Sequence, residues 1–263
     1  MKNLILTWAS NINEETWPQY RVYFNSVFLS KSQKEECVCL TDSLDNKYID
    51  QIVENFNFTV YIVKTKTRKL FTERWLAYWN FLKDRAFNQV FISDSRDVFL
   101  QQNPFEYTKN KNFNVYLTEE GFLHHNSPFN MADQLQFQRN IQNNFETYVN
   151  WPVVNAGVVM GNHQNIIDLS LIMWSNCLPS QSTDQAILNF LSSKFKDDIR
   201  YKFCNPNKDC FCLTGEVYKE KFLDFDPNWI DNKITNQDKE IFFVFHQWDR
   251  TNFADSVLNL FYK

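Results

Sequence analysis

Two carboxylates and an arginine follow an apolar run in the first half of the chain. The run at residues 90–93 (VFIS) leads directly into Asp94, Arg96 and Asp97. In open α/β sheets, ligands collect outside the carboxyl ends of the strands. Carboxylates three residues apart in a turn can converge on one hard divalent cation, and Mg²⁺ and Mn²⁺ prefer such oxygen ligands. The segment therefore predicts a divalent-cation site. The alternative is a surface turn in which Arg96 pairs with its neighbours.

A histidine closes the last strong apolar run of the chain, residues 240–246 (EIFFVFH). The chain has only four histidines. Imidazole is a common metal ligand, so a histidine at a strand end is a candidate for the same cation. The alternative for His246 is a hydrogen bond to backbone.

Alternating apolar and amphipathic stretches predict the elements that position these residues. In the first half, strands are expected over residues 3–8, 36–41, 59–63 and 89–94, and helices over 17–29 and 72–87. Such alternation favours an α/β fold with a mostly parallel sheet covered by helices.

The second half of the chain is less regular. Strands are expected over 114–118, 153–160 and 240–246, and helices over 166–178 and 183–195, with Ser182 or Thr183 as the cap of the latter. Residues 121–150 are polar and rich in Asn and Gln, which indicates a long excursion over one sheet edge. No repeat or Pro/Gly/Ser linker interrupts the chain, so residues 1–263 are expected to form a single domain.

The acidic segment resembles the metal-binding segment of GT-A glycosyltransferases, in the variant D-x-R-D-V-x-x-Q-x-x-P-F. The matching positions are Asp94, Arg96, Asp97, Val98, Gln101, Pro104 and Phe105. The resemblance implies a GT-A fold, with a Rossmann-like nucleotide-binding half and an acceptor-binding half. It also implies that Asp97 binds Mn²⁺ or Mg²⁺ directly, and that Asp94 binds the donor ribose or the metal through water. Ser95 stands where a strict D-x-D has its first Asp, so the division of labour among Asp94, Ser95 and Asp97 stays open.

Three further segments resemble the same family, in the family's order. Asn155-Ala156-Gly157 is similar to a strand that faces the donor sugar, and the alternative is a strand with a bulge at Gly157. Asp184-Gln185 resembles a pair at a helix start that lines the reaction centre, although an Asp is also favoured there by the helix dipole alone. The segment His246 to Arg250 (HQWDR) resembles the one whose histidine completes the metal shell.

Weaker matches concern the donor and the sugar. Arg74 resembles an arginine that reaches the donor phosphates, and a surface arginine is the alternative. Glu119 and Glu120 stand where the family often binds sugar hydroxyls, although they could form an exposed acidic turn. The donor base would lie at the end of the first strand, where Trp8 could stack on it or belong to the core. That strand end is formed by Thr7, Trp8 and Ala9.

The resemblance implies transfer of a sugar from a nucleotide-diphosphate sugar, with UDP-sugar expected, to a glycan or other hydroxyl acceptor. An inverting enzyme would use Asp184, Glu119 or Glu120 as the base, whereas a retaining one would place Gln185 beneath the anomeric carbon. The combined segments favour retention. One alternative is an inactive protein of the same fold that binds sugar nucleotides or glycans. A haloacid-type phosphatase is disfavoured, since Arg96 replaces the second Asp of D-x-D-x-[TV].

Composition excludes other classes. The chain has 4 Gly and no GxGxxG or GxxxxGK[ST] segment, which argues against a Rossmann dehydrogenase or a P-loop NTPase. A formal net charge of −4 without a strong basic cluster argues against a nucleic-acid partner.

No signal peptide or membrane span is recognisable, so a cytoplasmic location is expected. Cys204, Cys210 and Cys212 match no CxxC pair, which leaves a zinc site weakly indicated. The oligomeric state is not readable.

Overall fold

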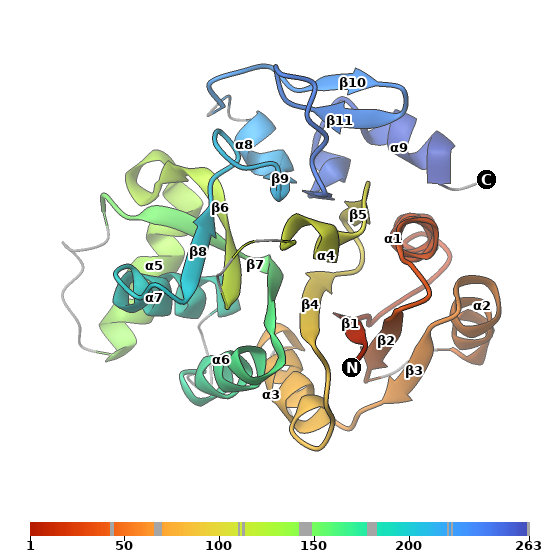
Figure 1. The fold of residues 1–263 in the computed structure, drawn as a ribbon. Coiled ribbons are helices and arrows are strands. Elements are labelled where there is room, and N and C mark those ends of the chain that lie inside the picture. Colours follow the sequence, from red (N-terminus) through yellow and green to blue (C-terminus); the bar gives the residue numbers. More distant parts are fainter. Residues whose placement is uncertain are drawn as a thin grey trace.

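A seven-stranded sheet forms the centre of the molecule, in the order β3-β2-β1-β4-β7-β6-β8 (Figure 1). The computed structural model describes residues 1–42, 45–65, 70–109, 111, 114–141, 149–177, 183–219, 221 and 223–261. The strands of this sheet are β1 (Asn3–Trp8), β2 (Glu35–Thr41), β3 (Thr59–Ile62), β4 (Gln89–Asp94), β6 (Val115–Leu123), β7 (Pro152–Asn162) and β8 (Tyr201–Cys204).

The sheet is mostly parallel, as predicted. Strands β3, β2, β1 and β4 pair in parallel, and so do β6 and β8. Strand β7 runs antiparallel to both of its neighbours, β4 and β6. The carboxyl ends of β1 and β4 therefore meet at one edge, with Trp8 in register with Asp94. The predicted mixed α/β architecture is confirmed.

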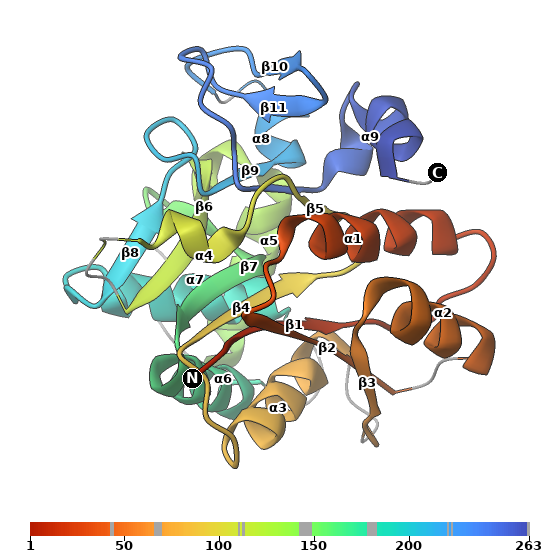
Figure 2. The ribbon, with the colours of Figure 1, turned by 45° about the vertical axis from the view of Figure 1, so that its right-hand side comes forward.

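Helices cover both faces of the sheet because its buried strands are apolar on both sides. Leu4 and Leu6 of β1 face the core beneath α3 (Leu70–Leu82), α6 (His163–Ser175) and α7 (Asp184–Phe195). Ile5 faces the opposite core, beneath α1 (Trp17–Ser30) and α2 (Asn46–Phe56). Figure 2 shows α1 on one side of β1 and β4, with α3 and α6 on the other.

A second, three-stranded sheet brings the end of the chain back to the middle. Its order is β5-β12-β9, formed by β5 (Val98–Leu100), β12 (Val244–His246) and β9 (Cys212–Thr214). It packs with the hairpin β10 (Asn228–Ile230) and β11 (Lys233–Thr235), and with α9 (Ala254–Phe261), around Phe99, Phe242 and Phe245. The remaining elements are α4 (Pro104–Tyr107), η1 (His124–Asn126), α5 (Pro128–Ile141), α8 (Gly215–Lys219) and η3 (Trp248–Arg250).

The excursion expected over residues 121–150 contains regular structure in its described part. Strand β6 continues to Leu123, and α5 follows after η1. The buried face of α5 consists of Asn130, Gln134, Phe137 and Gln138, so one face of this helix is buried although its sequence is polar. Residues 142–148 lie outside the described residues.

Smaller differences concern element ends. Helix α3 stops at Leu82 rather than at residue 87, and β12 begins at Val244 rather than at residue 240. Ile241 makes only an isolated bridge to Thr235. Thr183 is the N-cap of α7, and its hydroxyl accepts a hydrogen bond from Ala186 N at 3.1 Å. Ser182 lies outside the described residues.

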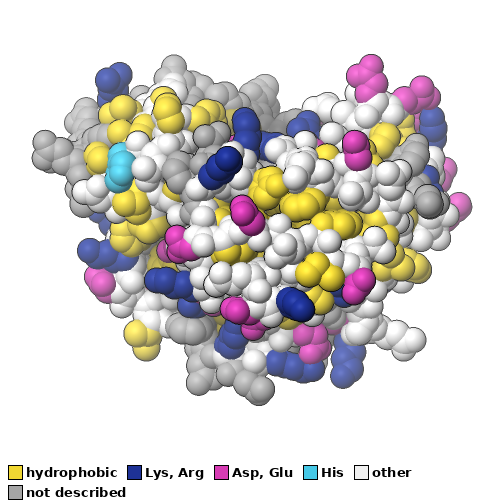
Figure 3. Space-filling model, turned by 90° about the horizontal axis from the view of Figure 1, so that it is seen from above, with side chains coloured by type: hydrophobic (Ala, Val, Ile, Leu, Met, Phe, Trp, Pro, Cys, Tyr) yellow, Lys and Arg dark blue, Asp and Glu magenta, His cyan; other side chains and the backbone are white. Residues whose placement is uncertain are grey.

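The face that carries β10 and α9 presents mixed charges. Seen from above the view of Figure 1, acidic and basic side chains are interspersed, and apolar side chains gather across the middle (Figure 3). Within the described part of the chain, no helix has the length and apolar character needed to cross a membrane.

Candidate functional site

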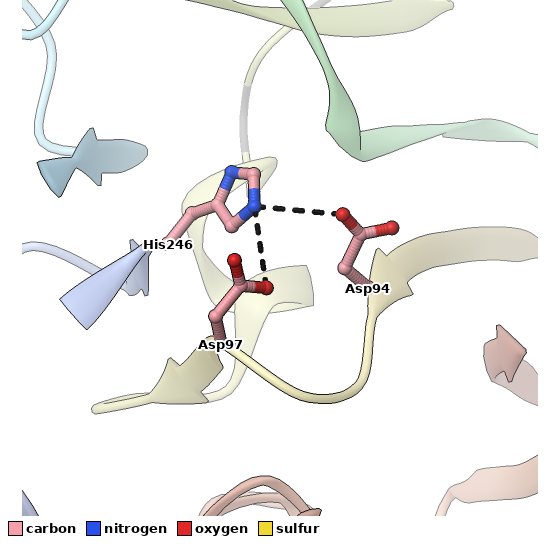
Figure 4. Close-up of side chains that lie close together, drawn as sticks. All are labelled: Asp94, Asp97 and His246. Carbon is pink, nitrogen blue, oxygen red and sulfur yellow. Dashed lines mark ion pairs between the residues drawn. The ribbon is translucent and has the colours of Figure 1, made fainter. Parts of the chain in front are cut away.

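Asp94, Asp97 and His246 converge at the carboxyl end of β4. Asp94 is the last residue of β4, and Asp97 immediately precedes β5. Strand β12 pairs antiparallel with β5 and places His246 opposite Val98. His246 Nε2 lies 3.5 Å from Asp94 Oδ2 and 3.5 Å from Asp97 Oδ1 (Figure 4). One ligand atom from each residue lies within 4.8 Å of the others, which suits a single metal ion. We call these three residues the metal triad.

Backbone hydrogen bonds hold the two segments of the metal triad together. Gln247 N donates to Asp97 O at 2.6 Å, just after the histidine. Gln247 takes a left-handed conformation with φ 59° and ψ 35°, which turns the chain sharply away from β12. Ser95 Oγ donates to Trp8 O at 2.7 Å, so its hydroxyl ties the acidic turn to β1 instead of facing the triad.

The charges of the metal triad are strongly coupled. Burial opposes charge on His246, but Asp97 and Asp94 outweigh it and raise the pKa of His246 to about 10. Burial also opposes charge on Asp94, but Arg74 and His246 hold the pKa of that carboxyl well below its ordinary value. The two carboxylates therefore favour the protonated form of the imidazole. A metal ion bound there would displace that proton, because a ligand nitrogen must be neutral.

Gly157 lies directly against the metal triad. A Cβ atom at this position would be 2.4 Å from His246 Cε1 and 2.8 Å from Asp94 Oδ2. Strand β7 breaks register with β6 here, because Leu117 pairs with Val159 whereas Thr118 pairs with Asn155. The predicted irregularity at Asn155-Ala156-Gly157 is thus present. Its effect is to bring bare backbone up to the triad.

Asn155 supports this irregular strand. Its Oδ1 accepts from Gly157 N at 2.7 Å, and its Nδ2 donates to Glu120 Oε1 at 2.5 Å. Burial raises the pKa of Glu120, although the bond from Asn155 acts in the opposite direction. The two neighbouring glutamates point to different places, as expected for successive residues of a strand. Glu119 Oε2 instead accepts from Asn205 Nδ2 at 2.8 Å, away from this side.

Arg74 on α3 connects the metal triad to the start of α7. Its side chain is 12% exposed, and its Nη1 donates to Asp94 Oδ1. Asp184 Oδ2 accepts from Arg74 Nε at 2.9 Å, from Arg74 Nη2 at 2.5 Å and from Trp75 Nε1 at 3.1 Å. The guanidinium that was predicted to reach donor phosphates is therefore engaged by two carboxylates.

A pocket of about 350 Å³ opens beside this network, and we call it pocket 1. It is bordered by Gln247, next to the triad histidine, and by Gln185, next to Asp184. Apart from Phe129, which is 68% exposed, the lining is polar. The lining residues are Glu120, Phe129, Asn130, Thr183, Gln185, Glu216, Gln247 and Arg250. Arg250 Nη1 donates to Glu216 Oε2 at 3.2 Å.

Several predicted site residues lie in the core. Thr7 and Ala9 are fully buried, and Trp8 is 7% exposed. Thr7 Oγ1 donates to Ser93 O at 2.8 Å, and the Trp8 ring belongs to the core beneath α3. Cys204, Cys210 and Cys212 form no cluster with metal-ligand geometry within the described residues, where the only such group is the metal triad.

Three pocket residues, Phe129, Asn130 and Glu216, lie outside every segment singled out in the sequence. Phe129 and Asn130 lie in the polar stretch that was expected to cross one sheet edge, where the helical spacing of Asn130, Gln134 and Gln138 was the available signal. Glu216 follows a short strand and lies far in sequence from the matched segments. No pattern in its neighbourhood indicates a site.

Comparison with known proteins identifies the fold. No protein-family model matches the chain, and no curated protein matches it. Galactosyltransferase LgtC in complex with donor and acceptor sugar analogues matches with a TM-score of 0.56 and 14% identity, covering 99% of this chain and 96% of that one. An active-site mutant of LgtC matches with a TM-score of 0.57 and 13% identity, covering 98% and 94%.

A second protein matches over a similar extent. Apo mouse xyloside xylosyltransferase 1 has a TM-score of 0.56 and 10% identity, with coverage of 94% of this chain and 97% of that chain. Identities this low speak for the fold alone. The chain therefore has the GT-A fold that was predicted.

Proposed function

We propose that this chain is a metal-dependent glycosyltransferase, with residues 1–263 acting as one GT-A domain. It would move a sugar from a nucleotide-diphosphate sugar, with UDP-sugar as the expected donor, to a hydroxyl of a glycan or other acceptor. The observation that carries the proposal is the metal triad, which lies at the carboxyl end of β4 in this fold and beside a polar pocket. Ligands gather at that edge of open α/β sheets.

The metal triad fits a divalent cation. Its donor set is two carboxylates and one imidazole nitrogen, and Gly157 leaves room that a side chain would fill. Carboxylates suit Mn²⁺ and Mg²⁺, and the imidazole favours Mn²⁺ of the two. Asp94, Asp97 and His246 would hold the ion, which as a Lewis acid would neutralise the charge that develops on the departing nucleotide diphosphate.

The surrounding residues would orient the sugar and stabilise the charge on it. Glycosyl transfer passes through an oxocarbenium-like state, which favours electron-rich groups near the anomeric carbon. Asp184 Oδ2 already accepts three hydrogen bonds from Arg74 and Trp75, so this oxygen is engaged within the protein. Gln185 borders pocket 1 and has a weakly nucleophilic carbonyl oxygen. These positions favour retention, and Glu120 is the candidate base for inversion.

The test is the substitution Asp97→Ala. We expect Mn²⁺-dependent binding of UDP, measured by titration calorimetry, to fall at least about 100-fold, because a direct ligand contributes more than the outer-shell partners of metal sites. Arg96→Ala is the matched control, since Arg96 lies one residue away and is exposed. Unchanged binding in Asp97→Ala would contradict the proposal.

A donor screen separates the enzyme from an inactive binding protein. UDP-, GDP- and CMP-sugars, with and without Mn²⁺, would be ranked by the shift in unfolding temperature. The best donor would then be tested for hydrolysis and for transfer to a range of acceptors. Turnover supports the glycosyltransferase, whereas tight binding without turnover across all acceptors supports the binding protein.

A further inference from the structure

The first turn of α7 is held from two sides. From α3, Arg74 and Trp75 bind Asp184. From α5, side chains bind the residues before and after it. Thr183 Oγ1 donates to Asp133 Oδ2, and Gln185 Nε2 donates to Asn130 Oδ1 at 2.7 Å. Helix α5 therefore determines how the residues flanking Asp184 are presented to pocket 1.

Asn130 is itself held in place. It is 6% exposed and lies in the first turn of α5, where it lines pocket 1. Its Nδ2 donates to Ser127 Oγ at 3.0 Å, which leaves Asn130 Oδ1 turned toward α7. Ser127 is 7% exposed, so the pair is largely shielded from water. A shielded hydrogen bond holds its geometry better than one that competes with solvent.

This arrangement selects which end of the Gln185 amide faces pocket 1. Because Asn130 Oδ1 can only accept, Gln185 must turn its NH₂ group toward α5. The carbonyl oxygen Oε1 is then the end of the amide that does not contact Asn130. It has no hydrogen-bond partner among the described residues, and Gln185 itself borders pocket 1. A flipped amide would present N–H donors to the same space.

We propose that Asn130 is a positioning residue that directs the Gln185 carbonyl oxygen into pocket 1. This inference rests on the proposed function and adds a residue that orients Gln185 for it. A carbonyl dipole pointing its negative end at a sugar stabilises positive charge at the anomeric carbon, whereas an NH₂ group would oppose it. Among the described residues, the side-chain hydrogen bonds of Asn130 go to Ser127 and Gln185, and none goes to the metal triad or Asp184, so its effect would reach the reaction through Gln185.

The experiment compares two substitutions of Asn130 in the full chain with Mn²⁺. Asn130→Asp keeps an acceptor of the same shape, and Asn130→Leu keeps the volume but removes the acceptor. Release of UDP from a panel of UDP-hexoses is measured as kcat and KM. We expect Asn130→Leu to lose on the order of 10- to 100-fold in kcat, with little change in donor KM, and Asn130→Asp to retain most of kcat.

Gln134→Leu is the matched control. Gln134 lies one turn further along the buried face of α5 and makes no hydrogen bond to α7 among the described residues. We expect it to leave kcat unchanged. If Asn130→Leu does not fold, as judged by its thermal transition, Asn130→Ala takes its place in the comparison.

The outcomes separate this inference from the proposed function. Wild-type kcat in Asn130→Leu overturns the positioning role. An Asn130→Asp variant as slow as Asn130→Leu also overturns it. The Gln185 amide would then act with its NH₂ group, and not its carbonyl oxygen, toward pocket 1. A wild-type protein that binds UDP with Mn²⁺ but turns over no donor overturns the glycosyltransferase itself and this role with it.

Discussion

Backbone hydrogen bonds between β5 and β12 hold His246 beside Asp97, whereas a side-chain hydrogen bond joins Asn130 to Gln185. The β5–β12 pairing and the bond from Gln247 N to Asp97 O fix the metal triad. Side-chain hydrogen bonds from Thr183 to Asp133 and from Gln185 to Asn130, together with the contact of Phe137 with Phe190, join helix α5 to α7. We call Phe129 and Asn130, the residues of α5 that line pocket 1, the α5 wall. The metal triad and the α5 wall thus lie at one site, but strand pairing holds the first in place and side-chain contacts hold the second.

The difference teaches which part of the site tolerates change. A backbone ladder persists when exposed side chains are replaced, so the metal triad depends on its own three residues and on the space beside them. The buried face of α5 is mostly carboxamide, and the amide atoms of Gln134 and Gln138 have no hydrogen-bond partner among the described residues. The packing of α5 at pocket 1 is therefore less stable than the strand pairing that holds the metal triad.

The largest effect is expected where a charge network joins the two regions. Arg74→Ala leaves Asp184, whose side chain is 9% exposed, without its counter-ion, and it leaves Asp94 with His246 alone; breaking such a buried pair typically costs about 3–5 kcal/mol. Urea unfolding at neutral pH measures the loss. Because the pKa of Asp94 is lowered in the folded protein, its contribution exists above the ordinary carboxyl range and disappears as pH falls. The difference between variant and wild type should therefore shrink in acid.

The exposed pair of Arg200 and Asp198 supplies the control for that substitution. These side chains also form a 2.6 Å ion pair, but on the surface. Arg200→Ala should leave the unfolding transition in place, since water screens the pair. Equal losses in the two variants would show that the Arg74 network is no more than a surface interaction.

The second effect tests the space beside the metal triad. Gly157→Ala adds a methyl group within 2.4 Å of His246 Cε1, so the histidine or β7 must move. We expect Mn²⁺-dependent UDP binding to be lost in calorimetry, with a fall of about 1–3 kcal/mol in the free energy of unfolding from overpacking.

A glycine on the same strand distinguishes local from general crowding. A Cβ at Gly161 would lie 2.5 Å from Asn114 O, at the other end of β7 from the triad. Gly161→Ala should destabilise the fold while metal-dependent binding persists. Loss of binding in both variants would trace the defect to β7 as a whole and not to the triad.

A smaller effect concerns the buried glutamate of pocket 1. Burial raises the pKa of Glu120, so the folded state favours its protonated form. Stability is then highest at low pH and declines as pH rises above the ordinary carboxyl range. Glu120→Gln keeps the acceptor for Asn155 and removes the charge, so at pH 7 it should gain on the order of 1 kcal/mol in urea unfolding. A gain that is the same at pH 4 and pH 8 would rule out ionisation as its cause.

The smallest effect comes from the buried face of α5. Gln138→Leu replaces a buried carboxamide that has no hydrogen-bond partner among the described residues by an apolar group of similar size, which should raise the free energy of unfolding by up to about 1 kcal/mol. Hydrogen exchange of α5 should slow in parallel, because opening of the helix becomes less favourable. Faster exchange in Gln138→Leu would mean that the amide has a stabilising partner after all.

The part of the fold that could be predicted is the part with strong local patterns. Strands β1, β2 and β4 are nearly continuous apolar runs, and Asp94 ends one of them. Helix α2 was overlooked although Tyr48, Ile52 and Phe56 form a buried stripe behind the N-cap Asp45. Its signal was available in the spacing.

The rest depends on contacts that a linear pattern does not encode. The buried face of α5 carries Asn130, Gln134 and Gln138, whose polarity is typical of a loop. The pairing of β12 with β5 joins segments from opposite ends of the chain. Glu120, and not Glu119, faces pocket 1 because of a register break between β6 and β7. The three hydrogen bonds to Asp184 depend on the position of α3, which carries Arg74 and Trp75.

The pairing of β5 with β12 also sets the order of events during folding. Asp94 and His246 come together only after the long intervening chain has closed, and closure of distant segments is slow compared with local helix formation. A molecule in which β12 has not yet paired with β5 would have the acidic turn without its imidazole. An ion that needs all three side chains would bind late, and it would add its stabilisation only to molecules whose last strand is already in place.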